Sequence, residues 1–187
     1  MSAAVGHPAA AAFTHRRAQH ADVVLLKPLM AASIRALLRD FLPPDAVEAS
    51  FEVMGLDTRL IDDGTYFVVE CDGLIAGCGG WSRRSTLFGG DHSAARNDAV
   101  LDPKNDAARV RAMYTSPDFA RRGVGRLVLS LCEQAAAAEG FARTELAATL
   151  AGEPLYRACG YQEIERFEAP TSKGVSIPLI RMGKIIL

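Results

Sequence analysis

The segment 109–140 constrains the fold of this chain most, because it joins a strand pattern to a helix pattern through a short turn that contains two glycines. Residues 109–115 have the pattern of a β-strand, and residues 116–123 form a loop. Apolar side chains then recur at helical spacing until Gly140, which ends the helix. The buried stripe of this helix consists of Val124, Leu127, Val128, Leu131 and Ala135. The segment therefore predicts a chain that mixes strands and helices.

The turn at the start of this helix has the composition of an anion site. Gly123 and Gly125 let backbone N–H groups face outward, and the dipole of the helix adds positive potential. Arg121, Arg122 and Arg126 add charge, so the turn can cradle a diphosphate. The alternative is a plain strand-to-helix connection in which the glycines serve only the geometry of the turn.

Further elements follow from hydrophobic spacing and turn residues on both sides of this segment. They are a helix over residues 25–41, a short helix over 45–54, a hairpin of 65–70 and 74–78, a strand over 144–149, a short helix over 154–159, and a closing antiparallel pair over 161–167 and 175–182. Residues 83–108 show no sustained period. A loop of that length in a compact domain is usually functional or mobile, and we expect it to border the substrate.

Composition places the chain among globular proteins. Its 187 residues are 49% hydrophobic and 23% charged, which predicts one domain over residues 11–187 behind a flexible tail, residues 1–10. The net charge of -1 predicts neither a nucleic-acid partner nor an anionic membrane surface. No apolar run is long enough for a membrane span. Four cysteines without a CxxC pair indicate reduced thiols, and we expect a cytoplasmic protein.

The order of these elements carries a family resemblance. The strand at residues 109–115, the sequence Arg-Arg-Gly-Val-Gly at 121–125, the following helix, the strand at 144–149 and Leu-Tyr-Arg-Ala-Cys-Gly-Tyr at 155–161 together resemble the GNAT N-acetyltransferase superfamily. The resemblance implies an α/β, mixed α+β protein with the GNAT-like acyl-CoA transferase fold. It implies a central mixed, mostly antiparallel sheet of six to seven strands flanked by about four helices.

The same resemblance implies a site. Acetyl-CoA would place its diphosphate on the glycine turn and its pantetheine arm along the preceding strand, and a splay between that strand and the next would admit the thioester. The implied contacts are Met113, Tyr114, Thr115, Arg121, Arg122, Gly123, Val124, Gly125 and Arg126. Tyr156 would protonate the departing CoA thiolate, since a phenol of pKa about 10 stays protonated at neutral pH. No metal is expected.

The chain departs from the family pattern in three places. Ala120 stands where a Gln or Arg is frequent, and Thr149 stands where an Asn is common. Some relatives carry a general-base glutamate on the strand at residues 109–115, but this strand contains no carboxylate. The general base is therefore unassigned.

The resemblance implies transfer of an acetyl group from acetyl-CoA to a primary amine of a small molecule or peptide, directly, in a ternary complex. The alternative is a noncatalytic acyl-CoA-binding sensor or interaction module on the same fold. An acetyltransferase that acts on aminoacyl-tRNA would need a basic platform, which the neutral net charge argues against. The acceptor is not identified, and whether the protein forms a homodimer is left open.

Several single residues have two readings. Tyr156 is either the acid or a packing residue, and Trp81 is either core or the wall of an acceptor pocket. His92 could supply the missing base or be a solvated loop residue. Cys159 could be a nucleophile only with a partner His, which the sequence does not indicate, so a buried thiol is expected instead. The four histidines lack metal-ligand spacing: His7, His15, His20 and His92.

Overall fold

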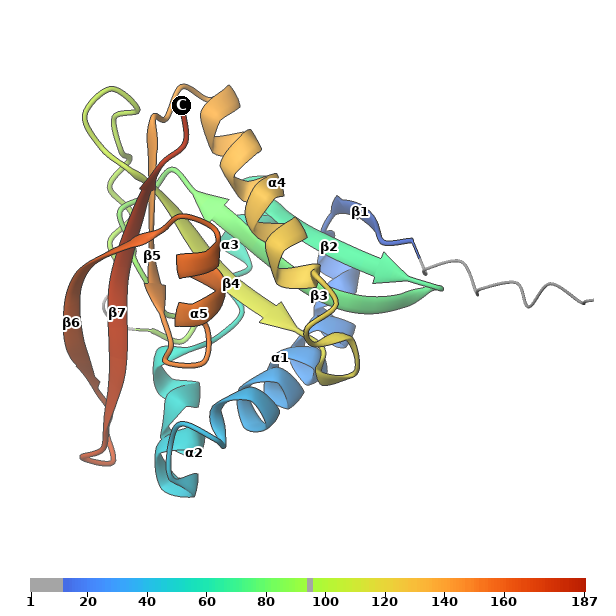
Figure 1. The fold of residues 1–187 in the computed structure, drawn as a ribbon, viewed down its shortest axis with the longest axis vertical. Helices are drawn as coiled ribbons and strands as arrows, with labels where there is room; N and C mark the ends of the chain where they lie inside the picture. The colour runs from blue at the N-terminus through green and yellow to red at the C-terminus, as the bar shows by residue number, and fades with distance from the viewer. Residues whose placement is uncertain (1–11, 94–95) are drawn as a thin grey trace, which may run out of the picture.

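The computed structural model describes residues 12–93 and 96–187, and the predicted tail lies outside these ranges. Its described part contains one sheet of seven strands in the order β1-β2-β3-β4-β5-β7-β6 (Figure 1). The strands are β1 (Thr14–Arg17), β2 (Tyr66–Cys71), β3 (Leu74–Ser82), β4 (Ala108–Thr115), β5 (Arg143–Ala148), β6 (Gln162–Pro170) and β7 (Ser176–Ile185). Every neighbouring pair is antiparallel except β4 and β5. The predicted mixed, mostly antiparallel sheet is confirmed.

The hairpin of β2 and β3 forms where the sequence predicts it. Asp72 and Gly73 both have positive φ, 50° and 79°, as a two-residue turn with left-handed central residues requires. Strand β3 continues to Ser82, four residues beyond the predicted end at Cys78, because it pairs with β4 as well as with β2.

Five α-helices accompany the sheet in the described ranges, one more than the predicted number of about four. They are α1 (Val23–Leu38), α2 (Pro44–Val53), α3 (Arg59–Asp62), α4 (Val124–Ala138) and α5 (Glu153–Ala158), with short 3-10 turns at His20–Asp22 and Pro117–Phe119. Helix α1 ends before Phe41, whose side chain is 48% exposed and does not extend the apolar stripe. None of the described helices is both long enough and apolar enough to cross a lipid bilayer.

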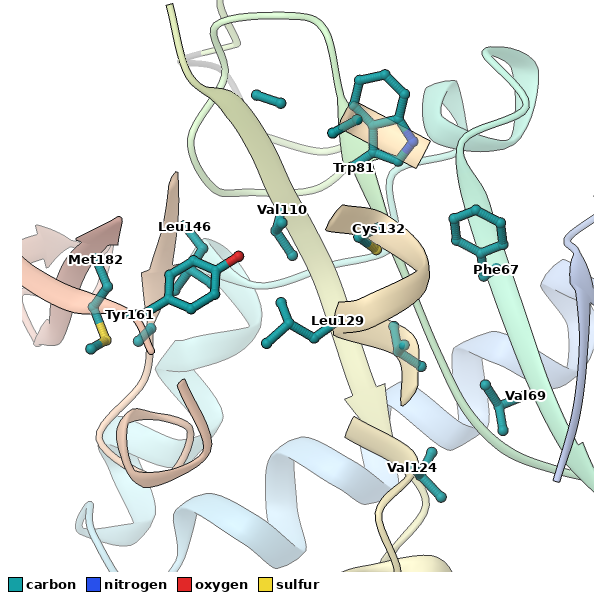
Figure 2. Packing of buried hydrophobic residues seen from close by; sticks show 14 of the residues in the cluster. Phe67, Val69, Trp81, Val110, Val124, Leu129, Cys132, Leu146, Tyr161 and Met182 are labelled. Carbon is teal, nitrogen blue, oxygen red and sulfur yellow. The ribbon is translucent and has the colours of Figure 1, made fainter. Parts of the chain in front are cut away.

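The two faces of the sheet have separate cores. Along β2, Phe67 and Val69 join the cluster that contains residues of α4, whereas Tyr66 and Val68 join the cluster that contains residues of α1. Successive strand residues point to opposite faces, so α4 covers one face and α1 covers the other. Figure 2 shows the first cluster, with Leu129 and Cys132 of α4 packed near Val110 of β4.

Trp81 belongs to this core and not to a pocket wall. Its side chain is 1% exposed, and its ring meets Phe141 edge to face at 5.9 Å between centroids. Of the two readings of Trp81, the structure supports the core residue.

Candidate active site

Strands β4 and β5 separate soon after they begin. Only two residue pairs join them, Ala108 with Thr144 and Arg109 with Glu145, and the strands then diverge toward their carboxyl ends (Figure 1). From Val110 onward, the edge of β4 that faces β5 has no partner strand in the described chain. Backbone N–H and C=O groups on such an edge are available to a ligand.

A cavity of about 210 Å³ lies at this divergence. Its walls come from both faces of the sheet and from segments far apart in the chain. The lining residues are 33, 34, 37 and 38 of α1; 53 of α2 with 54 and 55 after it; 87–89 of the long loop; 110–115 of β4; 125 of α4; 146 and 147 of β5; 149, 151, 152, 155 and 156 around α5; and 179 of β7. Three residues of the long loop thus border the cavity.

A bulge in β4 lies at the same point. Cys78 pairs with Tyr114 and Gly80 with Arg111, so β4 has one more residue than β3 between these pairs. Ala112, inside the bulge, has φ of 49°, a left-handed conformation that costs an L-residue about 1–2 kcal/mol. The Tyr66 hydroxyl donates a 2.7 Å hydrogen bond to the Ala112 carbonyl and holds it there. Bulges bend and twist a strand, and this one lies just beyond Arg109, the last residue of β4 that pairs with β5.

The glycine turn leads into α4, and the first turn of this helix lies beside the cavity at Gly125. Gly123 is the N-cap residue with φ of 91° and has no side-chain cap, and a Cβ there would have no neighbour within 4 Å. The first N–H groups of α4 have no partner within the helix. Arg121, Arg122 and Arg126 are exposed around this turn, and the Arg122 guanidinium lies 4.9 Å from the centre of the Phe119 ring.

Gly125 serves a different purpose from Gly123. A Cβ at Gly125 would lie 2.8 Å from Cδ2 of Leu155, so the absence of a side chain lets α5 approach α4. Gly125 lines the cavity, whereas Gly123 does not. The two glycines that the sequence presents as a pair therefore have different neighbours.

Tyr156 of α5 lines the cavity and is partly buried. Its hydroxyl lies 3.7 Å from the Met113 sulfur, a weak acceptor, and its ring meets that of Tyr161 edge to face at 5.9 Å. Burial raises the pKa of the Tyr156 phenol above its ordinary value. The group is thus a protonated donor at the wall of the cavity, and it also packs against a neighbouring ring.

Some of the other predicted contact residues present their side chains to the cavity, whereas others have side chains buried in the core. Met113 and Thr115 line the cavity with partly buried side chains. Tyr114 also lines it, but its side chain is 5% exposed and its hydroxyl donates to the Gly55 carbonyl at 3.1 Å. The Val124 side chain is 1% exposed in the α4 core. For Tyr114 and Val124, the side chain serves the core and the backbone is what remains for a ligand.

A buried ion pair borders the cavity, and the sequence analysis missed it. Arg111 donates to Asp57 at 2.6 Å and to the Gly89 carbonyl at 2.8 Å, and Arg96 donates to the other Asp57 oxygen at 2.7 Å. Asp57 and Arg111 have side chains 1% and 3% exposed. Burial lowers the pKa of Arg111, and Asp57 opposes that shift. The pair joins β4 to the segment after α2 and to the long loop.

The candidate base and the cysteine lie outside the cavity lining. His92 is exposed, and its Nε2 lies 3.1 Å from the Glu52 carbonyl oxygen. Cys159 is partly buried beside the α4 core, less enclosed than the expected buried thiol. Thr149 does line the cavity, where its Oγ1 accepts a hydrogen bond from the Gly152 N–H at 3.1 Å. Within residues 12–93 and 96–187, no three His, Cys, Asp or Glu side chains group as metal ligands would.

A seven-stranded sheet that opens beside a bulged strand, with a glycine turn entering a helix at the opening, defines an acyl-CoA transferase type of fold. The model of the acetyltransferase (GNAT) domain matches residues 62–163, more than half of the chain. The chain belongs to the GNAT acetyltransferase family.

Solved structures of GNAT proteins share the whole fold. A GCN5-related N-acetyltransferase from Rhodopseudomonas palustris is 18% identical with a TM-score of 0.69, covering 96% of this chain and 99% of that one. The PaiA N-acetyltransferase from Thermoplasma acidophilum, in complex with coenzyme A, is 11% identical with a TM-score of 0.63, covering 93% and 99%. YncA from Salmonella typhimurium, a putative acetyltransferase with acetyl-CoA, is 17% identical with a TM-score of 0.62, covering 94% and 95%. No curated protein matches the chain.

Proposed function

We propose that this protein is an acetyl-CoA-dependent N-acetyltransferase that moves an acetyl group directly to a primary amine in a ternary complex. The observation that carries the proposal is the cavity at the divergence of β4 and β5, whose walls belong to both faces of the sheet. A donor on the α4 face and an acceptor on the α1 face can meet there without a covalent enzyme intermediate.

The residues on the α4 face suit coenzyme A. Gly123 has an open left-handed conformation, and the free N–H groups that follow it, with Arg121 and Arg126, match a diphosphate. The unpaired edge of β4 from Met113 to Thr115 matches the amides of a pantetheine arm. When bound, acetyl-CoA supplies the acetyl group as a thioester. Two of the neighbouring GNAT structures contain coenzyme A or acetyl-CoA, which supports this cosubstrate.

Tyr156 holds the proton that a departing thiolate requires. Its phenol is protonated, its only hydrogen-bond partner in the described chain is a thioether, and it lies on the cavity wall. Donation from its Oη to the sulfur as the C–S bond breaks would therefore disrupt no strong existing hydrogen bond. The amine nitrogen loses one proton as it bonds to the acetyl carbon, and return of that proton to the Tyr156 phenolate, directly or through water, leaves the amide and the free thiol as products. A CoA thiol is already a fair leaving group, so this assistance contributes only part of the rate.

The test is release of free CoA thiol from acetyl-CoA with a panel of primary amines, followed by mass detection of the acetylated products. An acetyltransferase releases thiol only when amine is present and forms one acetylated amine per thiol. Binding of acetyl-CoA without turnover on any amine would support the alternative, a noncatalytic acyl-CoA-binding sensor or interaction module.

Direct transfer has its own test in initial rates. With both substrates varied, a ternary complex gives reciprocal plots that intersect, whereas a covalent acetyl-enzyme gives parallel plots. Parallel plots would retain the acetyltransferase and overturn the direct route.

A further inference from the structure

Away from β4, the acceptor side of the cavity is formed almost entirely by apolar side chains. The α1 face of β4 carries Arg111 and Tyr114, so cavity walls in contact with that face belong to the acceptor side. These walls come from α1, the end of α2, the long loop and β7, and their side chains are Ser33, Ile34, Leu37, Leu38, Val53, Met54, Leu87, Phe88 and Leu179. Among them, only Ser33 is polar.

The lining of the cavity also contains almost no charged residues. Within the described part of the chain, no Asp, Glu, His or Lys lines the cavity, and Arg111 is its single charged residue. Arg111 is already paired with Asp57, which Arg96 also contacts. The cavity therefore offers no carboxylate to an ammonium group and no side chain of ordinary basic strength to remove its proton.

From this lining we infer that the acceptor is a monoamine with an apolar substituent, and that it binds as the neutral amine. The inference rests on the proposed function and names its substrate class. An ammonium that enters a cavity without a counter-ion loses its hydration and gains no partner, which favours loss of the proton before binding. An apolar substituent replaces water against the walls of α1 and α2.

The same lining disfavours amines that carry a second charge. A diamine carries a second ammonium, and in this cavity that charge would meet leucine, isoleucine and methionine side chains and the guanidinium of Arg111. Because an unpaired buried charge is costly, polyamines and lysine-rich peptides should be poor acceptors.

The first experiment compares hexylamine with hexamethylenediamine, which differ only by the terminal amine. We expect kcat/KM for hexylamine to be at least about tenfold higher after correction for the two equivalent amines. A diamine that is used equally well or better would overturn the inference, while the proposed function would stand. If neither these nor any other amine is acetylated, the proposed function itself fails.

The second experiment concerns the protonation state. If the neutral amine binds and the cavity has no base, kcat/KM rises with pH and levels off at the pKa of the acceptor itself. The midpoint should then move downward when benzylamine, a weaker base, replaces hexylamine. A midpoint that is the same for both amines would report an enzyme base and would overturn the inference.

A third experiment places a charge in the wall. Leu37 lines the cavity on α1 and is only partly buried, so Leu37→Asp can fold while adding a carboxylate. We expect this variant to shift the ratio of kcat/KM between the diamine and the monoamine toward the diamine by about tenfold or more.

Two matched variants isolate the charge. Leu37→Asn has nearly the same shape as Leu37→Asp without the charge, and Leu25→Asp adds a carboxylate on α1 at a side chain that is 59% exposed and outside the cavity lining. Both should leave the selectivity ratio near its original value. A shift in Leu37→Asn as large as in Leu37→Asp, or no shift in a folded Leu37→Asp, would overturn the assignment of this wall.

Discussion

The two sides of the cavity are built in different ways. On the α4 side, the edge of β4, the glycine turn and the start of α4 occupy a single run of chain from Met113 to Arg126. On the α1 side, the wall combines α1, the end of α2, the long loop and β7, and the ion pair of Asp57 and Arg111 links β4 to the segment after α2 and to the long loop. The first side is local in sequence, and the second exists only when distant segments pack together. Substitutions on the α4 side and substitutions on the α1 side should therefore have different effects on binding and stability.

The largest effect is expected from the ion pair on the α1 side. Asp57→Ala leaves Arg111 buried without its counter-ion, and we expect it to lower the free energy of unfolding by about 3–5 kcal/mol, measured by chemical denaturation. In whatever fraction remains folded, acceptor KM should rise more than the dissociation constant of CoA.

Asp63→Ala is the matched control for that variant. Asp63 also pairs with an arginine, Arg84, but the two side chains are 14% and 27% exposed. Since water can reach this pair, its loss should cost much less stability. Equal losses in the two variants would show that burial does not set the contribution of the Asp57 pair.

Tyr156→Phe should lower kcat about 10- to 100-fold while leaving the affinity for acetyl-CoA nearly unchanged, because the proposed role of the phenol is to protonate the leaving group. Its raised pKa predicts that the wild-type rate does not fall through ionisation of Tyr156 as pH rises to about 10, the ordinary phenol value. Steady-state kinetics and equilibrium binding on the same variant measure both.

Tyr161→Phe provides the comparison. Its ring is the neighbour of Tyr156, and its hydroxyl is hydrogen-bonded to Thr144 at 2.8 Å, outside the cavity lining. This variant should lose about 1 kcal/mol of stability and keep its kcat. Wild-type turnover in Tyr156→Phe would leave that tyrosine with a packing role alone.

On the α4 side, Gly123→Val should weaken CoA binding about tenfold, or about 1.4 kcal/mol, since valine disfavours φ of 91° and adds a side chain at the proposed diphosphate site. Gly140→Val introduces the same kind of strain, at φ of 90°, beyond the other end of α4. Calorimetric titration with CoA should show the loss only in the first variant. A similar loss in both would assign it to backbone strain.

The smallest effect is expected at the bulge of β4. Ala112→Gly relieves the left-handed conformation but adds chain entropy to the unfolded state, so we expect a net stabilisation of about 0.5–1 kcal/mol, seen as a higher Tm. Ala108→Gly, in the same strand without a positive φ, should be destabilising. A destabilised Ala112→Gly would show that the bulge is not strained.

Predictions from sequence are confirmed where the pattern involves residues that lie close together in the chain. The hairpin around Asp72 and Gly73 followed from the turn residues, and α4 followed from its apolar spacing and from Gly140. The end of α1 was predicted too late because Phe41 matched the helical spacing, although its side chain stays largely exposed. Spacing records where an apolar residue stands, but not whether a partner surface exists beside it.

The pairing of distant groups escaped sequence analysis for the same reason. An arginine in a strand and an aspartate after a helix carry no mark that they will meet, and Asp57 lies 54 residues before Arg111. Their pairing depends on how α2, the long loop and β4 close on one another. The sequence pattern of β4 likewise gave no sign of the left-handed Ala112.

The sequence by itself determined the order of strands and helices, the glycine turn, the mixed sheet and, through the family pattern, the acyl-CoA transferase fold. These features depend on the backbone preferences of individual residues and on the periodic spacing of apolar residues, and both are properties of residues that are close together in the chain. Only the tertiary structure decided where β4 leaves β5, why Gly123 and Gly125 differ, and that the cavity wall on the α1 side is largely apolar with one paired arginine. Those features arise from contacts between segments far apart in the chain, and such contacts exist only once the chain has folded.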